Sequence, residues 1–149
     1  MIHTTLLAIR EVVAEAVLGI DPSFPEYTET EWNRVKAIRD TTGALRNFFV
    51  RLLPSRETTE SFYGDGISKE SELQIWVGYD GLPDDEDGPM VDEDGRQLYL
   101  ALVATIDPTN NGIEAYTPTG WVYEVEDPGH VVGYHSFVVR FLSSDELNP

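Results

Sequence analysis

The alternation of side chains from Glu72 to Tyr79 constrains the fold of this chain more than any other feature. Every second residue from Leu73 to Tyr79 is apolar or aromatic, and the opposite face of the same strand carries Glu72, Gln74 and Trp76. Successive side chains of a strand point to opposite faces of a sheet, so this period of two predicts a strand with one buried face.

The same reasoning predicts three more strands. A strand from Phe48 to Leu53 ends at Pro54 and is expected to form an antiparallel hairpin with residues 72–79. The polar tip of that hairpin covers residues 55–71 and turns at 64–66. Further strands are predicted over 121–126 and 133–142, joined by a turn at 127–129. One face of the last strand carries Phe137, Val139 and Phe141.

Helical spacing of apolar residues predicts helices around these strands. The first runs from Leu6 to Val17, with Thr4 or Thr5 as its cap and a left-handed C-cap at Gly19. A second helix over 28–38 begins with a capping box. A third covers 98–106, with a strand that begins at 97–100 as the alternative. After residue 142 the sequence is a polar tail. We therefore expect a single domain, residues 1–149, with an α+β fold: an antiparallel (mixed) sheet of about four strands with helices packed on one face.

Charge is divided unevenly along the chain. Residues 1–69 carry 10 acidic and 8 basic side chains, whereas residues 70–149 carry 17 acidic and 2 basic ones. Most of the basic residues form a cluster: Arg34, Lys36, Arg39, Arg46, Arg51 and Arg56. A loop predicted over 80–95 holds eight carboxylates, among them Asp84, Asp85, Glu86, Asp87, Asp92, Glu93 and Asp94. We expect these two sets to form complementary faces of a subunit that contacts its own copies.

The overall composition excludes several functional classes. A net charge of −17 argues against direct binding to nucleic acid or to an anionic membrane, because both need cations at the phosphates. The absence of cysteine excludes disulfides, thiolate nucleophiles and Cys-ligated metals. No apolar run reaches the length of a membrane span, and no signal peptide is predicted at the N-terminus.

No catalytic constellation emerges from the sequence, and we expect no enzymatic activity and no cofactor. The histidines are too scattered for a zinc site, and His135 and Ser136 are predicted on opposite faces of a strand, so they cannot form a dyad. The acidic loop fails the EF-hand pattern, which leaves weak Ca²⁺ or Mg²⁺ binding by residues 84–87 as an alternative to a solvated or partner-facing loop. Trp76 falls on the charged face of its strand, where it either anchors an interface or packs under a helix.

Several stretches resemble the tail-terminator (tail-tube completion) proteins of long-tailed bacteriophages. The similar pieces are the N-terminal helix, the FFVRL strand from Phe48 with its polar hairpin to LQIWV at Leu73, the helix ending in Ile106-Asp107-Pro108, and the closing GWVY and YHSFVVRFL strands. Residues 20–46 are longer than is usual in that family.

The resemblance implies a non-enzymatic virion protein. It implies a homo-oligomeric ring, generally of six copies, that terminates the tail tube and joins the tail to a head-completion or neck protein. Its partners would be other copies of itself, the tail-tube protein and that neck protein, and it would be assembled in the host cytoplasm. DNA would pass through a negative lumen without specific binding, because phosphates and carboxylates repel each other.

Three alternatives remain at this stage. A small, very acidic chain also fits a nucleic-acid mimic that blocks a basic DNA-binding protein. Other neck or connector proteins of similar size fit the same sequence features. A third reading is a small enzyme with an acidic site that no motif marks.

Overall fold

The computed structural model describes residues 4–20, 46–57, 67–80, 87–127 and 130–143. In chain order the elements are α1 (Leu6–Leu18), β1 (Arg46–Leu52), β2 (Arg56–Glu57), β3 (Ile67–Asp80), α3 (Asp87–Val103), β4 (Ile113–Asp127) and β5 (His130–Ser143). The strands form one sheet in the order β1-β3-β5-β4, with β2 also paired to β3, and every pairing is antiparallel. The predicted helix over 28–38 lies outside the described residues.

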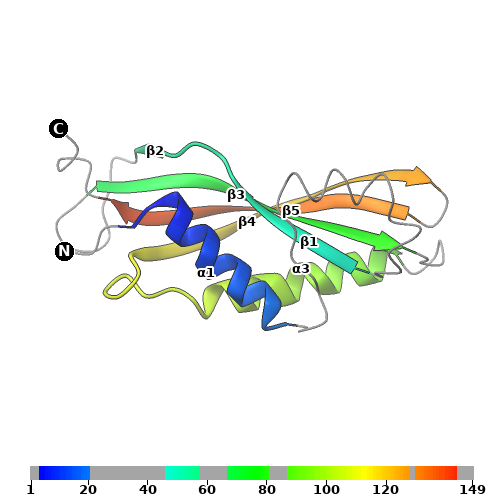
Figure 1. Cartoon of the computed structure of the whole chain (residues 1–149), viewed down its shortest axis with the longest axis horizontal. Coiled ribbons are helices and arrows are strands. Elements are labelled where there is room, and N and C mark those ends of the chain that lie inside the picture. The colour runs from blue at the N-terminus through cyan, green and yellow to red at the C-terminus, as the bar shows by residue number, and fades with distance from the viewer. Residues whose placement is uncertain (1–3, 21–45, 58–66, 81–86, 128–129, 144–149) are drawn as a thin grey trace.

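Both described helices cover the same face of the sheet (Figure 1). The core between the layers is built from alternate strand residues such as Ile75 and Val139, which are fully buried. Ile9 and Val13 of α1 and Leu102 of α3 pack onto them. The predicted α+β fold, with helices on one face of an antiparallel sheet, is therefore confirmed. Neither described helix combines the length and the apolarity needed to cross a bilayer.

The start of α1 matches its prediction and the end does not. Thr5 is the N-cap, and its hydroxyl accepts a hydrogen bond of 3.1 Å from the backbone N–H of Ala8. Gly19 was predicted to be left-handed, which is wrong: its φ is −67°, and its N–H donates to the carbonyl of Glu15. The helical geometry continues for one more residue because Ile20 packs against the core.

Removal of the N-cap is expected to weaken α1. Thr5→Ala leaves a backbone N–H of the first turn without its acceptor and should lower the free energy of unfolding by about 1 kcal/mol. Thr5→Ser keeps the hydroxyl and is the matched control. Urea denaturation followed by circular dichroism measures both variants; equal stability of the two would contradict the capping role.

The predicted hairpin between β1 and β3 is confirmed, with Phe48 opposite Val77 and Leu52 opposite Leu73. The polar tip predicted over 55–71 is too long, because β3 already begins at Ile67. All of β3 pairs with β5, so its polar first residues are held in the strand by backbone pairing with a partner of equal length. Ser71 is buried there, and its hydroxyl donates to the carbonyl of Leu53.

The acidic loop predicted over 80–95 is wrong for its second half, because α3 begins at Asp87. Two features favour a helix start here. Carboxylates in the first turns of a helix lie at the positive end of its dipole. Pro89 has no backbone N–H, so it leaves no donor without a partner in the first turn. The helix ends at Val103 rather than Ile106. Beyond Ala104 the hydrogen bonds span three residues instead of four, from Thr105 N–H to the carbonyl of Leu102 and from Ile106 N–H to that of Val103.

β4 is much longer than the predicted strand over 121–126 and begins at Ile113. Pro118 and Gly120 break the alternation of this stretch, and the structure accommodates them at a bulge on an edge strand. Gly120 has a φ of +127°, which favours glycine. A turn closed by hydrogen bonds to the carbonyl of Asp107 precedes β4, and Gly112 in it adopts a positive φ of +76°.

Candidate functional site

The predicted acidic face is only partly described. Residues 84–86 lie outside the described residues, and Asp87 opens α3. Asp92 and Glu93 are exposed on α3, and Asp94 is half-buried. These carboxylates therefore project from a helix, which fixes their spacing more tightly than a loop would.

Glu93 already has partners within its own helix. Its carboxylate accepts two bonds from the guanidinium of Arg96, at 2.9 Å from Nε and 2.7 Å from Nη2, and a third of 3.0 Å from the Gln97 amide. The hydrogen bonds from Arg96 and then Gln97 lower the pKa of Glu93 to about 2. Asp92 makes no hydrogen bond or ion pair to another described residue, so it is the better candidate for an intermolecular contact.

The predicted basic cluster is also described in part. Residues 34, 36 and 39 lie outside the described residues, and Arg46 begins β1. Arg51 is exposed near the end of β1, and Arg56 forms an exposed ion pair of 3.2 Å with Glu70 of β3. The described basic side chains of the cluster therefore lie around the corner between β1 and β2.

Trp76 lies on the face of the sheet opposite the helices. Its ring stacks on Phe49, with centroids 5.6 Å apart and planes 6° apart, and touches Tyr134 at 4.6 Å. Its indole N–H donates to the amide oxygen of Gln74 at 3.0 Å. Trp76 is thus half-buried in an aromatic cluster that joins β1, β3 and β5, an arrangement that neither of the two sequence interpretations described.

His135 occupies a buried site that the sequence search passed over. It lies on the inner face of β5, its ring 4.2 Å from that of Trp121, and Ser136 lies on the outer face, as predicted. Only 5 % of His135 is exposed, and its Nε2 has no hydrogen-bond partner. Burial lowers its pKa to about 4, against a smaller opposing effect of the nearby Asp94 carboxylate. Residues 135, 137 and 139 are two apart along the strand and therefore share a face, and this spacing indicates from the sequence that His135 is buried beside Phe137 and Val139.

Gly95 is the point where α3 passes closest to His135. A Cβ added there would meet His135 Cε1 and Nδ1 at 3.1 Å, closer than ordinary contact. The imidazole is also confined by Trp121 on β4, so it has little room to move away.

Gly95→Ala is therefore expected to destabilise the protein, although alanine normally improves a helix interior. The overpacking of the His135 site should outweigh the helix propensity and lower the free energy of unfolding by about 1–2 kcal/mol. In a His135→Ala background the same change should be neutral or stabilising, which a double-mutant cycle by urea denaturation measures. If Gly95→Ala stabilises the protein in both backgrounds, the His135 ring can move away from the added methyl group at no cost, and the prediction is wrong.

Glu114 forms a second buried polar site, on the outer face of the sheet. Its side chain is fully buried; Oε1 accepts a 2.7 Å hydrogen bond from Ser68 and lies 4.0 Å from Nε of Arg140. Glu114 lies within the bulge between Ile113 and Ala115. The sequence prediction missed it because it placed the start of this strand at 121.

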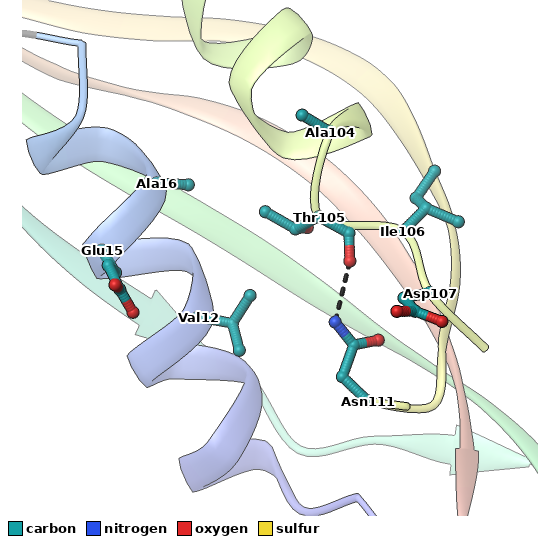
Figure 2. A pocket seen from close by; sticks show the side chains of 8 residues that line it. All are labelled: Val12, Glu15, Ala16, Ala104, Thr105, Ile106, Asp107 and Asn111. Atoms are coloured by element: carbon teal, nitrogen blue, oxygen red, sulfur yellow. Dashed lines mark hydrogen bonds between the residues drawn. The ribbon is translucent and has the colours of Figure 1, made fainter. Parts of the chain in front are cut away.

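A groove lies between α1 and the connection from α3 to β4, with a volume of about 400 Å³. In Figure 2, Val12 and Ala16 point from α1 toward the segment from Ala104 to Asp107. Glu15 stands on the α1 side of the groove and Asp107 on the opposite side. The arrangement offers apolar walls between two carboxylates.

Hydrogen bonds hold the groove wall opposite α1. Asn111 donates from its amide to the carbonyl of Thr105 at 2.8 Å, as Figure 2 shows, and accepts from the N–H of Ile113. The Thr105 hydroxyl donates to the carbonyl of Leu102, so Tyr116, 2.9 Å away, donates to Thr105. Burial raises the pKa of Tyr116 to about 12, which keeps that phenol protonated.

Within the part of the chain that the structure describes, no group of three or more His, Asp or Glu side chains is placed to hold a metal ion. The loop alternative of Ca²⁺ or Mg²⁺ binding by residues 84–87 stays a prediction, because these side chains are not described. No protein-family model matches the chain, and no curated protein is significantly similar to it in sequence.

Proposed function

We propose that this protein is a non-enzymatic structural subunit that assembles into a ring, and that the ring terminates a bacteriophage tail tube and joins the tail to the head or neck. The proposal rests on the resemblance of its strand and helix segments to tail-terminator proteins. The confirmed α+β fold supports it, because those segments form one sheet with the helices on one face.

The single observation that carries the assembly part is the separation of unlike charges in the subunit. The exposed arginines 51 and 56 lie around the β1–β2 corner, toward one end of the sheet, and the acidic first turns of α3 lie toward the other end (Figure 1). A subunit with unlike ends favours head-to-tail contacts, and such contacts close into a ring when the rotation between copies permits.

The particle mass of the purified protein tests this proposal. We expect light scattering to report a ring, with six copies of the 16.7 kDa chain giving about 100 kDa. The ring should dissociate as salt rises, because screening weakens contacts between exposed charges. Electron microscopy should show an annulus that caps tail tubes.

The nucleic-acid mimic makes the opposite prediction. Such a protein stays a monomer or dimer at every concentration and competes with DNA for a basic DNA-binding protein. A salt-independent monomer that neither forms annuli nor binds tube ends would overturn the ring proposal.

A further inference from the structure

We propose that the groove between α1 and the α3–β4 connection is a docking site for the β1–β2 corner, residues 51–56, of a second copy of this chain. The inference rests on the proposed function and deepens it, because it names a contact between copies in the ring that is separate from the acidic start of α3.

The groove has the chemistry of a receptor for an apolar segment flanked by cations. Val12, Ala16, Ala104 and Ile106 give it apolar walls, and Glu15 and Asp107 place a carboxylate on each side. The carboxylate of Asp107 accepts bonds only from Asn110 among the described residues, and these donors are neutral, so its negative charge is not offset there.

The groove is formed within the subunit before any partner binds. Bonds through Thr105 and Asn111 fix its wall against β4, and the opposite wall belongs to α1, whose Arg10 side chain donates to the carbonyl of Val50. A preformed site loses less conformational entropy when it binds.

The β1–β2 corner has the reciprocal pattern. Its sequence is Arg-Leu-Leu-Pro-Ser-Arg, so an apolar centre is flanked by one arginine on each side. Leu52 is half-buried against the core of its own subunit, so the half-buried Leu53 and the exposed Pro54 supply the apolar surface of the corner. Arg51 makes no ion pair with a described residue, and the Arg56 side chain remains 79 % exposed beside Glu70. Two cations around an apolar centre complement two carboxylates around an apolar groove.

The two surfaces lie on different parts of the subunit, which makes the contact heterologous. Figure 1 shows the β1–β2 corner along the edge of the sheet where β2 pairs with β3, whereas the groove lies between α1 and the end of α3. A copy that uses its corner on one neighbour therefore keeps its groove free for the next. This is the geometry that a ring requires.

Cysteine crosslinking tests the contact, because the chain has no cysteine of its own. The double variant Ala104→Cys, Pro54→Cys places one thiol in the groove and one on the corner. Mild oxidation is expected to produce a ladder of dimers, trimers and higher species, whereas a mixture of the two single variants stops at the dimer. The control pair Thr119→Cys, Pro54→Cys uses an exposed position on β4 outside the groove and should crosslink at least ten-fold less.

A charge exchange tests the electrostatic part of the contact. Adding Glu15→Arg to the crosslinking variant should reduce the ladder about ten-fold, and a further Arg51→Glu or Arg56→Glu should restore it. If neither exchange restores it, or if the control pair forms the same ladder, the proposed contact is wrong.

Native mass separates this inference from the proposed function. A ring without a ladder overturns the corner–groove contact and leaves the ring intact. A monomer without a ladder at millimolar protein overturns both.

Discussion

Phe48→Ala is expected to lower the free energy of unfolding by about 3–5 kcal/mol. The Phe48 ring is fully buried on the inner face of β1, opposite Val77, in the core that α1 and α3 cover. Its removal takes away buried apolar surface and leaves a cavity that the two helices cannot fill, because α1 is tied to β1 by the bond from Arg10 to Val50. A loss of this size is a large share of the 5–15 kcal/mol typical of a folded domain.

Leu7→Ala is the matched control for this core truncation. Leu7 is also a large apolar residue, but 67 % of it is exposed on α1. Its truncation should change the free energy of unfolding by less than about 0.5 kcal/mol. Urea denaturation monitored by tryptophan fluorescence measures both variants. Similar losses in the two would mean that the sheet face under α1 is not the core of the protein.

Acid is expected to destabilise the protein through His135. Burial holds this imidazole neutral in the folded state, with a pKa of about 4, whereas the unfolded chain binds a proton near the ordinary value of 6.5. Below pH 6.5 the unfolded state therefore carries the extra proton, and stability falls with pH until the folded state also binds it near pH 4. The contribution, complete above pH 6.5, amounts to about 3 kcal/mol.

Other groups also titrate in this range, so the comparison with a variant isolates His135. Among the described residues, Asp94 of α3 is the charged group that acts on the imidazole, and the neighbouring side chain of β4 is the uncharged Trp121. Between pH 6.5 and pH 4 the free energy of unfolding of His135→Gln should fall by about 3 kcal/mol less than that of the unaltered protein, whatever the stability of the variant at pH 8. Urea denaturation at several pH values measures the difference, and NMR titration of the His135 ring gives its pKa directly. An imidazole that titrates near 6.5 in the folded protein would refute the prediction.

The faces of the strands were predictable because they depend on local order. Leu73, Ile75 and Val77 alternate along one strand, and the period of two places them together whatever the strand pairs with. The hairpin with β1 followed from two adjacent strand patterns, and the cap at Thr5 from its place before an apolar repeat. These predictions needed no information from distant parts of the chain.

The ends of the elements were not predictable in the same way. β3 and β4 extend through polar or proline-containing stretches because both pair with the long strand β5. Ser68 of β3 and Thr117 of β4, for example, each lie opposite a residue of β5. Likewise, the acidic stretch from Asp87 becomes helical where local charge and glycine content suggested a loop. Long-range pairing and packing overrode local propensity in each case.

The predicted charged surfaces illustrate the same division. The sequence located the acids and bases along the chain, but not that Glu93 is held by Arg96 within its own helix or that Arg56 pairs with Glu70. The groove between α1 and the α3–β4 connection has no sequence pattern at all, because its walls come from segments about ninety residues apart.

The sequence by itself determined which apolar residues of β3 and β5 face the core and how unevenly charge is divided along the chain. These properties follow from spacing and composition, which are local. The tertiary structure alone decided the contact of Gly95 with His135, the burial of Glu114 and the acid-rimmed groove. Each of these depends on where a distant strand or helix comes to lie, and that placement is set by the packing of the whole sheet against its helices.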